Sequence, residues 1–206
     1  DVVITYGQGR MMRQLFKEAR KVTTSLIFFL GNQEYRDPSL FLPFDQVLVQ
    51  STYMKNHYWD NVGIQTDVFP LLIARSHYPD PDQALPVRSP GNRRLGFITM
   101  VNPSIEKGAM VFARLLRMAG KRRPDWTFLS VESRMTDKEW KQTGVDLPNQ
   151  PNVLWVANHQ EMRRIYERTS VLLFPSFINE GAGLCIAEAQ LAGIPILASS
   201  HAGPPE

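Results

Sequence analysis

Residues 179–189 read Asn-Glu-Gly-Ala-Gly-Leu-Cys-Ile-Ala-Glu-Ala and follow an apolar run at 171–175 after three loop residues. The run predicts a strand, and the residues from Gly183 onward predict a helix. Gly181 and Gly183 let the backbone approach a ligand closely, and the free N–H groups of a helix start favour an anion such as phosphate. Glu188, about a turn and a half into this helix, is placed to accept hydrogen bonds from a vicinal diol such as a ribose. The spacing alone is equally compatible with a glycine-containing loop before an ordinary amphipathic helix.

A second strand–turn–helix pattern lies at residues 100–108, which read Met-Val-Asn-Pro-Ser-Ile-Glu-Lys-Gly. It connects a predicted strand at 95–100 with a predicted helix at 109–119, so it also predicts an anion site at a helix N-terminus. Lys107 would place a point charge on a phosphate there. Taken by itself, a lysine in a loop is also compatible with simple solvation.

Most of the chain alternates short apolar runs with helical patterns. The runs are mostly continuously apolar, as expected for strands covered on both faces of a parallel sheet. This alternation predicts βαβ units and a doubly wound α/β fold. The predicted strands are 2–6, 25–30, 46–50, 67–72, 95–100, 126–131, 153–157, 171–175 and 195–199, and the predicted helices are 10–20, 52–59, 110–119, 160–168 and 184–192.

Residues 76–92 interrupt the alternation with four prolines and little apolar content, which predicts an interdomain linker. Residues 1–75 are then expected to be part of one Rossmann-like domain. Residues 93–206 are expected to be most of a second one, without its C-terminal end. The chain starts inside a strand-like run and without methionine, so we expect a piece of a longer protein whose incomplete first domain exposes apolar sheet surface.

The composition excludes several classes of protein. Among 206 residues, 43% are hydrophobic and 21% charged, which supplies a buried core and argues against disorder. The single cysteine, Cys185, excludes an intrachain disulfide and a site built on several thiolates, and predicts a reducing, cytoplasmic compartment. The net charge of +3 is too mild to indicate a nucleic-acid partner. The longest apolar runs fall far short of the ~20 residues that a membrane helix needs.

Together these motifs resemble the nucleotide-binding domain of family 4 glycosyltransferases of the GT-B fold. Residues 180–189 match that family's E-G-x-G-L-x-x-x-E-A motif, and Lys107-Gly108 matches the Lys-Gly that follows the first strand of its C-terminal domain. Residues 193–199 match the G-x-P-V-x-A-S continuation, and residues 201–206 resemble the G-G-x-P-E that follows it. Residues 44–72 also resemble the end of the family's N-terminal domain.

The resemblance implies a GT-B enzyme with two Rossmann-like domains, which transfers a sugar from a nucleotide diphosphate sugar with retention and without a metal. Lys107 would bind the donor diphosphate and Glu188 the ribose hydroxyls. Glu180 would contact the transferred sugar and steady charge at the reacting carbon, so that Glu180 and Lys107 are the catalytic pair. The implied donor-binding residues are Asn102, Lys107, Gly108, Arg134, Val156, His159, Gly181, Gly183, Leu184 and Glu188.

The chain departs from the family pattern at several positions. Asn102 stands where members often carry an arginine that clamps the diphosphate, and Arg134 is a candidate to compensate. Ala182 stands where a phenylalanine is common, which would open the sugar pocket. Where many members have a histidine, residues 30–32 read Leu-Gly-Asn, so Asn32 or Glu34 is a candidate to face the cleft instead.

The implied donor is a UDP-, GDP- or ADP-sugar, with no further cofactor, and the acceptor is a sugar, a lipid or another small molecule held by residues 1–75. A non-catalytic nucleotide-sugar-binding module, or an inactive fragment of such an enzyme, is the alternative. A receiver-like signalling domain would need an acidic cluster at a strand end, which the sequence lacks. The basic run at 121–123 leaves a peripheral membrane contact open, and the oligomeric state stays undetermined.

Overall fold

The computed structural model describes residues 1–78, 96–133, 135–142, 146–158 and 161–206. Contacts within it divide the chain into two units. Unit 1 comprises Asp1–Leu72 with the short segments Glu180–Ala182 and His201–Glu206, and unit 2 comprises Ile73–Asn179 with Gly183–Ser200. Most of the predicted linker lies outside the described residues, and the predicted domain boundaries stay a prediction.

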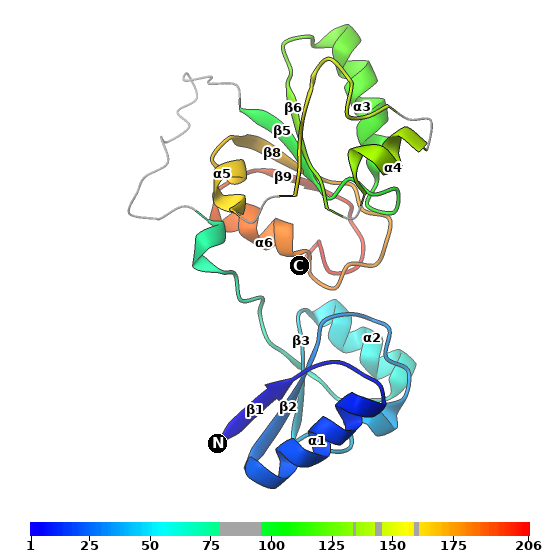
Figure 1. The fold of residues 1–206 in the computed structure, drawn as a ribbon, viewed down its shortest axis with the longest axis vertical. Helices are drawn as coiled ribbons and strands as arrows, with labels where there is room; N and C mark the ends of the chain where they lie inside the picture. Colours follow the sequence, from blue (N-terminus) through cyan, green and yellow to red (C-terminus); the bar gives the residue numbers. More distant parts are fainter. Residues whose placement is uncertain (79–95, 134, 143–145, 159–160) are drawn as a thin grey trace. The chain divides into compact units, whose positions relative to one another are not determined.

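Unit 1 is built on a four-stranded parallel sheet in the order β1-β2-β3-β4. Figure 1 labels β1, β2 and β3 of this sheet. Two α-helices and a 3-10 turn pack on one face of this sheet, where their apolar side chains form a single core with the strands. The elements are β1 (Val2–Thr5), α1 (Arg10–Val22), β2 (Ser25–Leu30), η1 (Pro38–Phe41), β3 (Gln46–Val49), α2 (Thr52–Val62) and β4 (Asp67–Val68).

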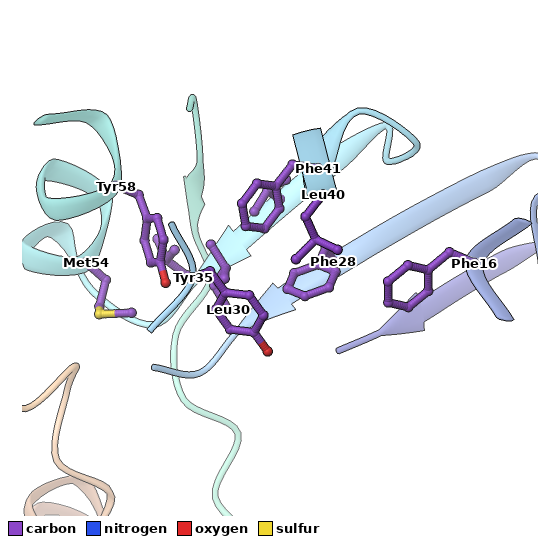
Figure 2. Packing of buried hydrophobic residues seen from close by; sticks show 10 residues of the cluster. Phe16, Phe28, Leu30, Tyr35, Leu40, Phe41, Met54 and Tyr58 are labelled. Carbon is purple, nitrogen blue, oxygen red and sulfur yellow. The ribbon is translucent and has the colours of Figure 1, made fainter. Parts of the chain in front are cut away.

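The core of unit 1 is centred on the ring of Phe28 (Figure 2). The rings of Phe16, Tyr35 and Phe41 meet it edge to face at centroid distances of 5.9, 5.5 and 5.3 Å. Edge-to-face pairs of this kind stabilise a core beyond the area that they bury. They bring α1, the loop after β2 and η1 together on one side of the sheet.

The opposite face of the unit 1 sheet is apolar and only partly covered. Ile27 and Phe29 alternate with the buried residues of β2 and are half-exposed, and Ile4 of β1 is 63% exposed. These three side chains line an open groove of about 630 Å³. The exposed apolar sheet surface expected from the sequence is therefore present.

Unit 2 is a five-stranded parallel sheet in the order β7-β6-β5-β8-β9 (Figure 1). One core contains α3 and α4 side chains and the other contains α5 and α6 side chains, and successive strand residues such as Phe128 and Leu129 enter different cores. The elements are η2 (Arg75–His77), β5 (Phe97–Val101), α3 (Ala109–Arg122), β6 (Phe128–Val131), α4 (Asp137–Gln142), β7 (Val153–Val156), α5 (Met162–Tyr166), β8 (Thr169–Phe174), α6 (Leu184–Leu191) and β9 (Ile196–Ala198). Unit 2 thus has the doubly wound arrangement predicted from the sequence.

The predicted strands and helices are confirmed apart from some of their ends. The strand predicted at 67–72 is wrong beyond Val68, because pairing with β3 ends there and Pro70 has no N–H to donate to a neighbouring strand. The helix predicted at 52–59 continues to Val62, where Gly63 ends it in a left-handed conformation. The short helix α4 was not predicted. Of the helices in the described part of the chain, none has the length and apolarity that crossing a bilayer requires.

Candidate functional site

The two predicted anion-binding loops of unit 2 meet at one edge of its sheet. β5 and β8 are adjacent parallel strands, with Met100 beside Leu173 in the register. The chain leaves β5 in one direction across the sheet and β8 in the other, so the loops after them flank the topological switch point. Ligands of open α/β sheets bind at this place. The loops also touch, because the N–H of Phe177 donates to the carbonyl of Glu106 at 2.9 Å.

Asn102 turns the chain at the end of β5. Its φ of 58° lies in the left-handed region, which asparagine tolerates better than most other non-glycine residues. Its N–H donates to the Val131 carbonyl at 2.9 Å, and its carbonyl accepts from the N–H of Ser104 at 2.8 Å. This left-handed turn favours a short polar residue such as asparagine at position 102, which the sequence alone did not reveal.

Lys107 and Gly108 lie where this loop enters α3. Gly108 is the N-cap residue, with φ 86° and no side-chain cap on the helix. A Cβ atom added there would lie 2.0 Å from the Pro175 carbonyl oxygen, so only glycine permits this approach of the two loops. The Nζ atom of half-buried Lys107 lies 5.8 Å from the ring centroid of Phe174, within the range of a cation–π interaction. The lysine is thereby held at the end of β8.

The second loop enters α6 through Gly183, as predicted. Gly183 has φ 81° and is the N-cap residue of α6, and no side chain caps the helix start. Leu184 is the first helical residue, with a 48% exposed side chain. The starts of α3 and α6 both follow strands at the switch point, and neither helix has an acidic residue in its first turn. Both starts therefore keep the partial positive charge that attracts an anion.

Glu188 is buried in unit 2, with 2% of its surface exposed. Its Oε2 atom accepts from the Tyr166 hydroxyl at 2.5 Å, and its Oε1 atom is 2.6 Å from His77 Nδ1. Burial is the main cause that raises the pKa of the Tyr166 phenol above its ordinary range, with neighbouring Cys185 and Glu188 adding to it. His77 and Tyr166 were not among the predicted site residues. No local motif indicates them, because they lie 111 and 22 residues from Glu188 in the chain.

Glu180 and Gly181 belong to unit 1, whereas Lys107, Gly183 and Glu188 belong to unit 2. Within unit 1, the Gly181 carbonyl accepts from the Ser51 hydroxyl, and the Glu180 carbonyl accepts from the N–H of Gly203 at 3.0 Å. A Cβ atom on Gly203 would lie 2.1 Å from the Gly181 carbonyl oxygen. The structure therefore assigns a packing role to this glycine of the C-terminal motif.

Five other predicted positions have different outcomes. Val156 ends β7 and is half-buried. Arg134 and His159 lie outside the described residues. In unit 1, Asn32 accepts from the N–H of Glu34 at 3.0 Å through its side-chain oxygen. Glu34 is exposed and lines an open hollow of about 810 Å³ beside the start of α1.

Comparison with known proteins identifies relatives of this arrangement. The family model described as "Glycosyl transferases group 1" matches residues 92–206, which is more than half of the chain. No curated protein matches the chain.

Several solved structures share the fold. The Anabaena protein HepE, in complex with UDP and glucose, is 15% identical with a TM-score of 0.65, over 97% of this chain and 60% of that one. A glycosyltransferase from Rickettsia africae ESF-5 is 18% identical with a TM-score of 0.68, over 98% and 58%. The pneumococcal O-GlcNAc transferase GtfA, in complex with UDP and GlcNAc, is 18% identical with a TM-score of 0.67, over 97% and 42%. These likenesses show an α/β fold of the GT-B type, and the chain spans about 60% of the length of the first two of these relatives.

Proposed function

This chain belongs to the group 1 glycosyltransferases, and on that premise we propose that it takes part in moving a sugar from a nucleotide diphosphate sugar to an acceptor. The observation that carries the proposal is the meeting of two ligand-binding loops at the switch point of unit 2. One loop brings Lys107 to the end of β8, and the other starts the helix that carries Glu188. We assign the protein to the family 4 type, with retention at the transferred carbon and without a metal.

Unit 2 holds the donor in this proposal. The starts of α3 and α6 and the ammonium of Lys107 bind the diphosphate, and Glu188 accepts hydrogen bonds from the ribose. The base lies near Val156 at the end of β7. HepE and GtfA are both described with UDP and a sugar, which supports a UDP-sugar ahead of the GDP- and ADP-sugars.

The chemical step separates the sugar from the diphosphate, on which negative charge grows. Groups fixed in advance toward that charge lower the barrier, because they need no reorganisation during the reaction. Lys107 and the two helix starts are such groups, and Glu180 contacts the transferred sugar. The acceptor, a sugar, a lipid or another small molecule, binds to residues 1–75, and the reaction takes place in the cytoplasm.

A non-catalytic nucleotide-sugar-binding module is the second candidate. It is favoured by Asn102, whose neutral side chain cannot supply the charge of the arginine found in many family members. Both candidates bind a nucleotide, and only the enzyme consumes a donor.

The test is a calorimetric titration of the chain with UDP, GDP and ADP and with their glucose derivatives, followed by donor consumption with the full-length protein. We expect binding of one nucleotide and donor consumption in the presence of an acceptor. Binding without transfer or donor hydrolysis would support the module, and absence of binding to all three nucleotides would contradict both candidates.

A further inference from the structure

The carboxylate of Glu188 already has a partner on each oxygen in this structure. The Tyr166 hydroxyl donates to Oε2, and His77 Nδ1 lies at hydrogen-bond distance from Oε1. An ionised carboxylate can only accept hydrogen bonds, so the proton of the second contact belongs to His77 Nδ1. A ribose diol that reaches both oxygens therefore meets an existing partner on each of them.

The two partners differ in how easily they can leave. Tyr166 is 1% exposed and part of the core between α5, α6 and the sheet. Without Glu188 its buried hydroxyl would lose its carboxylate acceptor, which is costly. The His77 side chain is 29% exposed and lies on η2, a three-residue turn packed against α5 (Figure 1). On leaving Glu188, His77 can hydrogen-bond to water instead.

We propose that His77 is an internal ligand of Glu188 that a nucleotide ribose displaces, and that Tyr166 is a positioning residue that keeps the carboxylate turned toward the ribose. This inference rests on the proposed function, in which Glu188 receives the ribose hydroxyls. It adds a competition inside the protein: each nucleotide bound costs the His77–Glu188 contact, so the segment before the predicted linker sets donor affinity.

The other charged groups on the elements near His77 have partners of their own. Glu161 pairs with Arg164, and Arg163 pairs with Glu167. On η2 itself, Arg75 lies over the ring of Tyr78 at 4.6 Å. Glu188 is thus the carboxylate that His77 contacts.

The experiment compares the wild type with His77→Ala, Tyr166→Phe and the control Ser76→Ala, which changes an exposed neighbour on the same turn. UDP, GDP and ADP are titrated calorimetrically under the same conditions for all four proteins. We expect His77→Ala to bind about 3- to 10-fold more tightly than the wild type, the effect of one hydrogen bond that no longer competes. Tyr166→Phe binds more weakly, and Ser76→Ala is unchanged.

The 2′,3′-dideoxy form of the bound nucleotide is the second probe. Because this form lacks the diol, it cannot replace His77 as the hydrogen-bond partner of Glu188. The affinities of His77→Ala and the wild type should therefore differ less for it than for the full nucleotide. Equal affinities of wild type and His77→Ala for the full nucleotide would overturn the displacement of His77 and leave the proposed function standing. No binding of any nucleotide by any variant would overturn both. If His77→Ala increased the affinity for the dideoxy form as much as for the full nucleotide, this would also contradict a competition between His77 and the ribose for Glu188.

Discussion

Lys107 is the residue whose charge the proposed reaction uses most directly. An interaction that strengthens as the diphosphate leaves raises the rate of the chemical step more than it raises binding. In the full-length enzyme, Lys107→Ala should lower turnover about a hundredfold or more, while donor affinity falls less. Donor consumption and calorimetry measure the two effects. Lys121→Ala, at the far end of α3, is the control, and equal losses in both measurements would mean that Lys107 only grips the donor.

In the proposed function, the contact with the ribose depends on Glu188. Replacing it by alanine should weaken nucleotide binding by about 1.5–3 kcal/mol, the range for hydrogen bonds to a charged group. Because Tyr166 then loses its carboxylate acceptor in the core, the stability of the variant must be measured as well. Glu161→Ala, an exposed carboxylate beside α5, is the matched control. Calorimetric affinities of Glu188→Ala within error of the wild type would contradict the assignment.

At the scale of one element, α3 is fixed by the glycine at its start. Gly108→Ala would place a methyl group against the Pro175 carbonyl and force a left-handed φ on alanine. We expect it to lower the free energy of unfolding by about 1–3 kcal/mol. Gly120 in the last turns of the same helix has only Asn152 Nδ2 within 4.0 Å of an added Cβ. Gly120→Ala should therefore raise stability by about 0.5–1 kcal/mol. Urea unfolding of both variants measures the contrast, and equal effects would be inconsistent with close loop packing.

The contact between Asp45 and helix α1 predicts how the stability of unit 1 responds to acid. Both Asp45 oxygens accept from the Arg20 guanidinium of α1, at 2.5 and 2.8 Å, and Asp45 also accepts from the N–H of Leu26 in β2. These hydrogen bonds hold the pKa of Asp45 below its ordinary value, and the bond with Arg20 has the largest effect. An aspartate whose pKa is lowered in the folded state stabilises the fold at pH values above its pKa in the unfolded chain, which is about 4. This stabilisation is lost as the pH falls through the pKa of the folded state.

The wild type should therefore lose more stability than Asp45→Asn between about pH 5 and about pH 3. Urea unfolding midpoints of both proteins at the two pH values measure the difference. Asp60→Asn, which removes the same charge from an exposed position on α2, is the control. A loss of the same size in Asp45→Asn would show that other carboxyl groups dominate the acid response.

At the scale of the whole molecule, the partly covered apolar face of the unit 1 sheet should control association. Exposed apolar groove surface favours contact between copies, so the 206-residue chain should self-associate as its concentration rises. Ile4→Lys, in the groove, should reduce this association. Met118→Lys, which adds the same charge at a 43% exposed position of α3, should reduce it less. Sedimentation velocity over a range of concentrations measures both, and a monomeric wild type would contradict the prediction.

The sequence alone determined the fold class and the two loops at the sheet edge, because both depend on short patterns. Apolar runs alternate with helical periodicity, and residues 100–108 and 179–189 each combine a strand end, a turn and a helix start. The start of the helix at Gly183 could be predicted from the sequence because a glycine and the apolar pattern lie within one turn of each other.

The tertiary structure decided which distant groups meet. The order β7-β6-β5-β8-β9 makes β5 and β8 neighbours, and that closeness explains why Gly108 has to be glycine beside Pro175. The same folding brings His77 to Glu188 across 111 residues of chain. No local pattern encodes such a pair, because a side chain's partner is set by which strands and helices pack together. The sequence therefore predicted that Glu188 lies on the helix after Gly183, and only the tertiary structure showed that its carboxylate contacts Tyr166 and His77.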